Sequence, residues 1–395
     1  MLFNHLKFFS YYFCALVGML TIVAGQQWII IGFLCFMGFF VLGDAFFGDD
    51  LTTPDYPFPR LLTLALWIAL PMSILVVLSG VWLTTSSTSW PMFTDAANAI
   101  SYNIVNAKQS TSYLQLSFAA LFCGLMLGGV GTISAHELVH RVSDKTSVCI
   151  GRWILALSFD ANFSIEHVYG HHRYVATEQD PATAPRGRNV YKHIALSLWY
   201  GNKSAWHIES KRLKRKQQSN LSWHNTCLRG YAMSAVWLLV VYLLAGIQGT
   251  AFAVVAGLIA KSMLEVVNYM EHYGIVRLTK QRVMPRHSWN TNRRFSCWTM
   301  FNLSRHSHHH AQGAVPFQLL KPMPEAPTMI NGYMATMLLT LIPPLWYKLM
   351  QPKLAEWDAH YANEQELSLI EQQTNNKHTQ AGSSSLSHLL RPNQP

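Results

Sequence analysis

Histidines gathered in four short stretches are the residues of this sequence best suited to chemistry. The chain has 18 histidines among its 395 residues. Ten of them stand in the strings HELVH, EHVYGHH, NYMEHYG and RHSHHH, and nine of these ten are candidate ligands, namely His136, His140, His167, His171, His172, His272, His306, His309 and His310. Side chains three or four residues apart share one face of a helix, so three of these strings each present two or three imidazoles together. The spacing predicts a metal site.

Nine imidazoles are more than one ion accepts, so their number predicts two metal ions. Imidazole suits iron, zinc, copper and nickel, and the absence of cysteine from the strings argues against structural zinc. A zinc protease would use HExxH with Glu137 as general base, but that reading explains only two of the nine histidines. Nearby carboxylates are expected to orient the imidazoles and offset the metal charge. These carboxylates are Glu137, Glu166, Asp180 and Glu271, and His308 is a possible further ligand.

The elements that must position these residues are predicted to be membrane helices. Half of the residues are hydrophobic and only 13% are charged, against roughly 25% in soluble domains. Six apolar runs approach spanning length. They are Tyr11–Ala24, Trp28–Phe47, Leu62–Leu83, Tyr113–Ser134, Tyr231–Leu244 and Thr250–Val267, the last two forming a hairpin near Gly246. The predicted fold is an all-α integral membrane protein with six transmembrane helices and a cytoplasmic histidine-rich region that binds two metal ions.

Charge sets the expected orientation in the membrane. Lys and Arg concentrate between the fourth and fifth apolar runs, whereas the loop 84–112 holds only Lys108. The positive-inside rule therefore predicts a multi-pass protein of the cell inner membrane with both termini and all histidine strings on the cytoplasmic side. The basic run Lys211–Lys216 is either a face for lipid headgroups or a docking site for a partner. The net charge of +10 follows from this bias and does not indicate nucleic acid.

The chain is expected to divide into five regions. Residues 1–135 hold four transmembrane helices, 136–228 form a cytoplasmic region with the first two histidine strings, and 229–270 form the transmembrane hairpin. Residues 271–362 hold the remaining strings and an apolar cap, Tyr333–Leu349, which Pro343 and Pro344 interrupt. The polar tail 363–395 is expected to be disordered. The six cysteines include no CxxC pair, so electrons for redox chemistry must come from another protein.

Several ordered strings give the chain a family resemblance. HELVHR, EHVYGHHRYVATEQDPATA, NYMEHYG, PRHSWN and LSRHSHHHA resemble the signature boxes of integral-membrane alkane 1-monooxygenases, in the group of membrane fatty-acid desaturases and hydroxylases. GDAFFGDD resembles that family's acidic loop, and the resemblance covers about residues 40–350. It implies that the nine histidines hold two non-haem iron ions. It also implies O₂-dependent hydroxylation of a terminal hydrocarbon C–H bond, alkane to primary alcohol. A rubredoxin or ferredoxin-type donor with its reductase would supply two electrons.

Departures from the family pattern leave the substrate open. His308 stands where alkane hydroxylases commonly have Asp, Arg188 where Glu is frequent, and residues 312–317 lack the usual Arg-rich continuation. The stretch LIPPLWYKLMQPKLAEWD resembles xylene monooxygenases. The alternatives are therefore a xylene-type methyl hydroxylase or an acyl-lipid desaturase or hydroxylase with the same iron site. A metal transporter is disfavoured, because transporters place ionisable ligands near the membrane midplane.

A substrate that dissolves in lipid is expected to reach the metals through a pocket between the apolar helices. Contacts in such a pocket would be almost entirely apolar, each buried CH₂ contributing about 0.8 kcal/mol. Candidate wall residues are Phe46, Trp67, Trp82 and Phe118.

Overall fold

The computed structural model describes residues 2–85 and 102–375, and every regular element in these ranges is helical. The first half comprises α1 (Leu2–Leu6), η1 (Lys7–Phe9), α2 (Ser10–Ala24), α3 (Gln27–Phe46), α4 (Pro59–Thr84), α6 (Ile104–Gln109), α7 (Tyr113–Met126), η2 (Leu127–Thr132), α8 (Ile133–His140), α9 (Lys145–Leu157), α10 (Phe163–Glu166), η3 (His167–His171) and α11 (His172–Tyr174). The second half comprises α12 (Val190–Arg215), α13 (Thr226–His272), η4 (Pro285–His287), α14 (Arg294–Thr299), α15 (His306–Ala311), η5 (Phe317–Leu319), α16 (Tyr333–Thr340) and α17 (Pro343–His360). The predicted all-α class is confirmed.

Five helical stretches of the described residues are long and apolar enough to cross a membrane. They are Leu2–Ala24, Gln27–Phe46, Pro59–Thr84, Tyr113–His140 and Thr226–His272. The first is longer than the predicted run, because α1, η1 and Ser10 add nine residues, about two and a half helical turns, before Tyr11. Lys7 lies in this extension and lowers its hydropathy, so the sequence pattern did not include it in the span. In the structure Lys7 is buried and pairs with Asp50 at 3.4 Å. The chain is therefore a multi-pass membrane protein.

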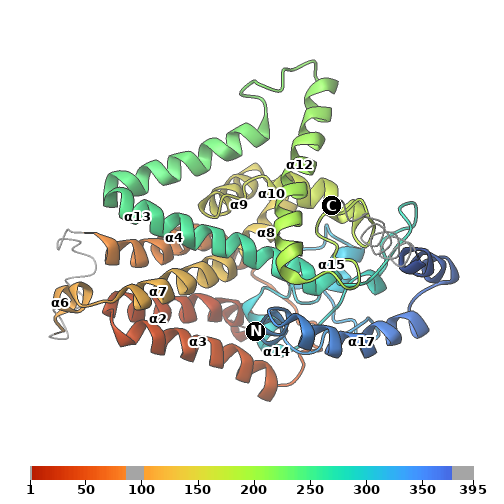
Figure 1. Ribbon diagram of the computed structural model, residues 1–395, viewed down its shortest axis with the longest axis horizontal. Coiled ribbons are helices and arrows are strands. Elements are labelled where there is room, and N and C mark those ends of the chain that lie inside the picture. Colours follow the sequence, from red (N-terminus) through yellow and green to blue (C-terminus); the bar gives the residue numbers. More distant parts are fainter. Residues whose placement is uncertain (1, 86–101, 376–395) are drawn as a thin grey trace, which may run out of the picture.

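The prediction of six separate spans differs from this count at one helix. α13 is continuous over 47 residues except at Gly246, whose backbone is not helical (φ 62°, ψ −160°). A straight helix of that length would measure about 70 Å, more than twice the hydrocarbon thickness of a bilayer. The left-handed φ at Gly246, which glycine adopts without a steric penalty, instead folds the helix into two arms, 226–245 and 247–272 (Figure 1). The two predicted runs of the hairpin lie within these arms.

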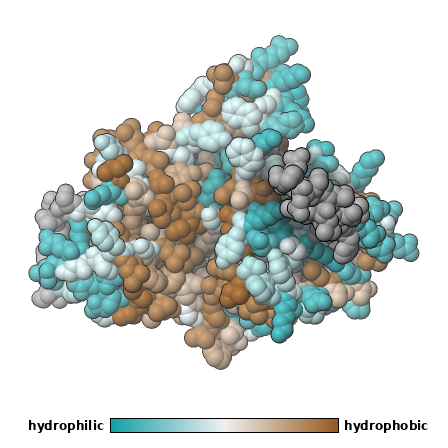
Figure 2. All heavy atoms as spheres, viewed as in Figure 1, coloured by the Kyte–Doolittle hydropathy of each residue, from teal (hydrophilic) through white to brown (hydrophobic). Residues whose placement is uncertain are grey.

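Apolar surface gathers over one part of the molecule. Figure 2 shows brown side chains over the region of α2, α3, α4, α7 and α13, with hydrophilic side chains at both ends of that region. Large apolar side chains on these helices are exposed, including Phe13, Leu20, Leu34 and Leu243. An exposed apolar belt of this kind would be unstable in water and fits hydrocarbon. The short helices that carry the histidine strings lie at one end of it.

Two helices cover the histidine-bearing end near the C-terminus. α16 and α17 are separated at Pro343, and among the described residues neither is both long and apolar enough to cross a bilayer. Trp346 and Trp357 of α17 are buried, and the Trp357 ring nitrogen donates to the Arg286 carbonyl at 2.7 Å. α17 therefore packs on the loop that precedes the fourth histidine string, RHSHHH.

The expectation of a disordered tail from Asn363 is wrong for its first part. Residues 364–375 are helical, and residues 376–395 lie outside the described range. Glu366 is fully buried and accepts hydrogen bonds from His287 at 2.9 Å and from Arg286 at 3.2 Å. The side chains of Asn363 and Glu366 also each accept a hydrogen bond from the other residue's backbone N–H, which caps the start of the helix. One buried carboxylate thus anchors a segment whose composition resembles a linker.

Replacing Glu366 with Ala is expected to release this helix. The change leaves His287 and Arg286 without their buried acceptor, which costs about 3 kcal/mol locally. Limited proteolysis in detergent should then cut within residues 363–375 much faster than in the wild type. Glu364→Ala, at an exposed position of the same helix, is the matched control and should cut at the wild-type rate. Equal cutting rates for both variants would contradict the anchoring role of Glu366.

Candidate metal centre

The structure brings all nine predicted histidines into two adjoining groups. Five ring nitrogens of the first group lie within 4.8 Å of one another, and two smaller groups with the same spacing share His272. The first group is His136, His140, His167, His172 and His309. The two smaller groups are His171, His272 and His310, and His272 and His306 with Glu271. Because they share His272, these two are together called the second group. His172 and His310 stack at 4.5 Å between ring centroids, so the groups form one continuous cluster.

A π-helical turn distributes the second histidine string between the two groups. η3, His167–His171, is wider than an α-turn and therefore rotates each residue less about the axis. His167 and His172 point to the first group, whereas His171 points to the second. The three rings still lie side by side in one cluster, since His167 and His171 stack at 5.0 Å between ring centroids. π-turns inside helices frequently mark functional sites.

Another π-turn precedes the first string. η2, Leu127–Thr132, contains Gly128 and Gly129 and leads directly into α8, which carries His136 and His140. A Cβ at Gly129 would lie only 1.7 Å from the Tyr11 hydroxyl oxygen, so no larger residue fits there without displacing Tyr11. The helix therefore widens where a side chain from α2 packs against its backbone.

Buried polar contacts hold the fourth string, RHSHHH, in place. Arg305, immediately before α15, is 1% exposed and donates to the carbonyl oxygens of Leu320, Asp50 and Thr52. The acidic loop after α3 thus binds the residue that begins the RHSHHH helix. Asp44 at the end of α3 likewise accepts from the Ser296 backbone and hydroxyl at 2.8 and 2.6 Å. Contacts more than 200 residues apart in sequence fix the position of His306, His309 and His310.

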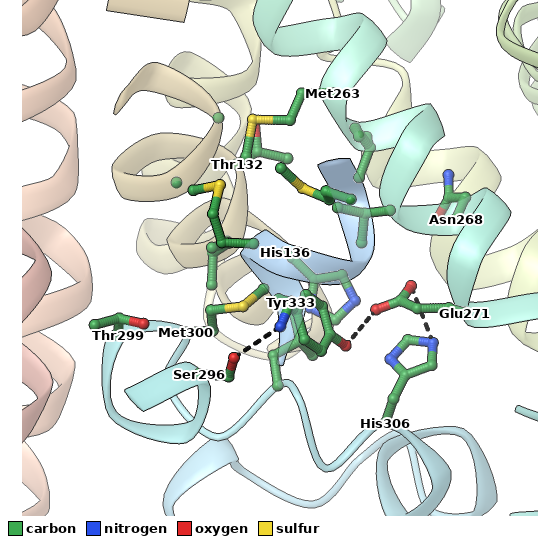
Figure 3. Close-up of a pocket in the computed structure, with 18 of the residues that line it drawn as sticks. Thr132, His136, Met263, Asn268, Glu271, Ser296, Thr299, Met300, His306 and Tyr333 are labelled. Carbon is green, nitrogen blue, oxygen red and sulfur yellow. Dashed lines mark hydrogen bonds and ion pairs between the residues drawn. The ribbon is translucent and has the colours of Figure 1, made fainter. Parts of the chain in front are cut away.

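Two of the four predicted carboxylates touch histidines of the cluster. Asp180 accepts from His171 Nδ1 at 2.9 Å, which leaves His171 Nε2 to face the second group. Burial lowers the pKa of His171, but the charge and hydrogen bond of Asp180 outweigh burial and raise it. Glu271 lies 3.2 Å from His306 Nε2 and accepts from the Tyr333 hydroxyl at 2.6 Å (Figure 3). Glu271 is therefore placed either to orient His306 or to bind metal itself.

The other predicted residues near the cluster are Glu137, Glu166 and His308. Glu137 pairs with Arg141 at 3.1 Å, and Arg141 also donates to Thr63 of α4, so Glu137 joins two helices. Glu166 Oε1 is buried, with no hydrogen-bond partner among the described residues. His308 is outside the metal-binding groups, and its Nδ1 faces the Lys321 backbone N–H at 3.5 Å.

The cluster fits bound metal. Both ring nitrogens of His136 and of His310, and Nε2 of His171, are buried without a hydrogen-bond partner among the described residues. An unsatisfied buried polar group costs about 1–3 kcal/mol, and coordination to a cation removes that cost. Burial, reinforced by neighbouring imidazoles, lowers the pKa of five rings, so they are neutral at physiological pH and their lone pairs are available. These rings are His167, His172, His306, His309 and His310.

An apolar cavity of about 800 Å³ ends at this cluster. His136, His167, His306 and Glu271 line its inner end. Its wall includes four methionines, Met263, Met300, Met334 and Met337. Methionine is flexible and fills irregular apolar space, so this wall suits a flexible apolar occupant. Figure 3 shows Met263 and Met300 on the cavity side of His136.

The wall residues proposed from sequence are wrong. Phe46 is 79% exposed, and the Trp67 ring nitrogen donates to Ser147. Trp82 lies under the Lys108 ammonium, and Phe118 packs on Phe33. Tyr333, the four methionines and Arg305 were not among the predicted site residues. Arg305 stands inside the string RHSHHH, but its contacts with Asp50 and Thr52 form only when the chain folds. Tyr333 and the methionines follow no spacing pattern, and folding alone brings them to the cavity wall.

Comparison with known proteins decides the family. The fatty acid desaturase family model matches residues 111–351. Alkane 1-monooxygenase 1 of Pseudomonas aeruginosa is 32% identical over 331 residues, which cover 82% of this chain and 81% of that protein. The chain belongs to the alkane 1-monooxygenases of the fatty acid desaturase family. Alkane 1-monooxygenase 2 of the same organism is 36% identical, and the match spans 65% of its length.

This chain is also similar to a xylene monooxygenase component. The xylene/toluene monooxygenase hydroxylase component XylM of Pseudomonas putida is 35% identical over 258 residues, 62% of this chain and 66% of that protein. Both parts of the predicted resemblance are therefore confirmed. The chain is an enzyme of the alkane monooxygenase type, and the family model covers every histidine of the cluster.

Substitution within the clusters is expected to remove metal selectively. His171→Ala and His310→Ala each delete a ring from the second group, and the purified variants should lose most of the metal bound by that group. His308→Ala is the matched control from the same string, since His308 lies outside both groups, and it should keep the wild-type metal content. Elemental analysis of purified protein measures both. Full metal content in His171→Ala and His310→Ala would contradict the assignment.

Proposed function

We propose that this protein is a membrane di-iron monooxygenase that hydroxylates the terminal C–H bond of a hydrocarbon, converting an alkane to a primary alcohol. The observation that carries the proposal is that nine buried imidazoles meet at the end of an apolar cavity. When bound, two non-haem iron ions would supply the chemistry that activates O₂ and oxidises the C–H bond. The family named by the similar proteins supports this chemistry.

The ligands divide as the geometry groups them. The first iron is held by His136, His140, His167, His172 and His309, and the second by His171, His272, His306 and His310. Asp180 orients His171 and Glu271 lies against His306. Outer carboxylates of this kind fix ring orientation, and their loss typically weakens metal binding 10–100-fold.

The cavity selects an apolar substrate. Its methionine, leucine and valine side chains offer dispersion contacts, and each CH₂ moved out of water contributes about 0.8 kcal/mol. Such a wall orients a hydrocarbon by shape, with its far end against His136 and His306. An alkylbenzene methyl group is the second candidate substrate, supported by the similarity to the xylene/toluene enzyme.

The arrangement in the membrane follows from the same features. We propose six crossings, with each arm of α13 crossing once, and both termini and the histidine cluster on the cytoplasmic side of the inner membrane. The basic polar regions between α8 and α13 support this orientation. A lipid-dissolved substrate then enters from the bilayer, and electrons arrive from the cytoplasm.

A groove of about 1760 Å³ gives an electron donor access to the cluster. It is lined by Asp180, which binds His171, and by Lys203, His207 and Arg188. Leu369 and Gln373 of the anchored C-terminal helix also line it. We propose that a rubredoxin or ferredoxin-type donor, reduced by its reductase, docks here, because its acidic surface would complement these basic residues.

The basic run Lys211–Lys216 is a weaker docking site. It lies at the end of α12 that Figure 1 shows away from α15. Arg212 in this run is committed to structure, since it holds Glu209, which accepts from the Thr226 backbone N–H at the start of α13. The other basic members of the run, Lys211, Lys214, Arg215 and Lys216, are exposed and suit lipid headgroups.

Reconstituted enzyme is expected to oxygenate a terminal carbon. With octane, ¹⁸O₂, a rubredoxin and its reductase, mass spectrometry should find 1-octanol carrying one ¹⁸O atom. Parallel reactions with xylene and a fatty acyl substrate test the alternatives. A labelled benzylic alcohol formed far faster than 1-octanol would favour the second candidate, and a desaturated acyl product without oxygen in the carbon chain would contradict hydroxylation.

Charge reversal separates the two docking sites. Lys203→Glu is expected to raise the KM for the donor roughly tenfold at low ionic strength, with the difference shrinking as salt screens the charges. Lys211→Glu, on the same helix but outside the groove, is the control and should leave that KM unchanged. Steady-state kinetics with varied donor concentration measures both. A larger effect of Lys211→Glu would move the docking site to the end of α12.

A further inference from the structure

A second cavity, polar where the first is apolar, adjoins the metal cluster. It has a volume of about 440 Å³, and Asp160, Glu166, Glu265, Lys261 and Asn268 are among its lining residues. Phe163, His167 and Asn268 line both cavities, so the two spaces meet at the first metal group. Different faces of α13 serve them: Lys261, Glu265 and Asn268 recur at helical spacing on the polar side, and Met263 and Val267 line the apolar side.

The polar side chains of this cavity form two buried hydrogen-bonded sets. Lys261 lies 3.1 Å from Asp160 and donates to the Phe159 carbonyl at 2.9 Å. Glu265 accepts from the Ser197 hydroxyl at 2.5 Å and from the Asn268 amide at 3.2 Å. These residues are all at most 9% exposed. A membrane helix that buries a lysine and a glutamate one turn apart does so at a high energetic cost, which marks ionisable groups in such helices as functional.

Glu265 differs from its charged neighbours in how it is held. Asp160 and Lys261 pair with each other. Glu265 instead binds two uncharged side chains, a hydroxyl and an amide, and both contacts use the same oxygen, Oε2. The Ser197 hydroxyl can donate to a carboxylate or accept from a carboxylic acid. The site therefore accommodates Glu265 with or without a proton.

The cavity also has a route to solvent. Gly201 and Asn202 of α12 line it and are half-buried. Ordered water typically occupies a buried polar space that offers several hydrogen-bonding groups. Water can thus connect the α12 surface to Glu265, and Glu265 to the side of the cluster formed by Glu166 and His167.

The proposed hydroxylation requires such a route. The balanced reaction is RH + O₂ + 2e⁻ + 2H⁺ → ROH + H₂O, in which the substrate carbon and the donor's two electrons together reduce O₂. One oxygen atom forms the new C–O bond, and the other leaves as water with the two protons. The apolar cavity excludes water, so it cannot supply protons at the rate of turnover.

We propose that the polar cavity between α10, α12 and α13 delivers the protons consumed at the metal centre, with Glu265 as the buried proton carrier. This inference rests on the proposed function, because it assigns the source of that reaction's protons. The Asp160–Lys261 pair keeps the cavity lining polar, and Ser197 and Asn268 orient the carboxyl group of Glu265. Substrate and protons therefore reach the first metal group from opposite sides of Phe163 and His167.

Glu265→Gln tests the route, because Gln keeps the shape and hydrogen bonds of Glu but cannot carry a proton. Loss of a positioned proton carrier typically costs 10²-fold or more. Turnover with octane should fall by at least roughly tenfold, with iron content and the KM for octane unchanged. The solvent deuterium isotope effect should rise, and part of the electrons should appear as hydrogen peroxide. Glu265→Asp should restore coupling, and Glu364→Gln, on the exposed face of the C-terminal helix, should match the wild type.

Other outcomes would overturn the proposal. Wild-type coupling and isotope effect in Glu265→Gln would show that protons arrive elsewhere. Loss of iron along with activity in Glu265→Gln, unrestored in Glu265→Asp, would show a structural role. The proposed function fails separately, because wild-type enzyme would then form no alcohol at all, whereas the proton route fails when wild type and Glu265→Gln form it equally well.

Discussion

The concentration of neutral imidazole nitrogens in a dry interior is the constraint on which the rest of the structure depends. Nine rings from four separated stretches converge, and several of their nitrogens are buried without a hydrogen-bond partner among the described residues. Such an arrangement is unfavourable without cations, since each orphaned group costs about 1–3 kcal/mol. The surrounding structure must therefore hold the rings together before metal arrives. Arg305, Asp44 and the π-turn η3 do this through contacts distant in sequence.

Three approaches to the cluster differ in chemical character. The apolar cavity reaches it between α13, α14 and α16. The polar cavity is lined by His167 and His171 together with Glu265, and a groove lies beside Asp180, which accepts from His171. A monooxygenase must admit a hydrocarbon, electrons and protons without letting water reach the reacting carbon. Separate approaches meet that need, because each is lined by side chains that suit one of the three.

Much of this arrangement could be predicted from the sequence, because its main signals are local. Histidine spacing pointed to eight of the nine clustered rings, His272 was added as the lone histidine of NYMEHYG, and apolar length identified the candidate spans. The omissions and errors have physical reasons. Helical spacing cannot reveal that η3 is a π-turn, which sends His171 to a different group from His167. The helix at 364–375 depends on one buried contact of Glu366, which composition does not show. Cavity walls such as Met300 and Tyr333 depend on tertiary packing, so aromatic residues in the spans were the wrong candidates.

The most direct test of the central claim is the metal content and spectrum of purified wild-type protein grown with ⁵⁷Fe. Elemental analysis and Mössbauer spectroscopy should find two iron ions per chain in nitrogen-rich, non-haem surroundings. A single ion per chain, or zinc in place of iron, would contradict the account.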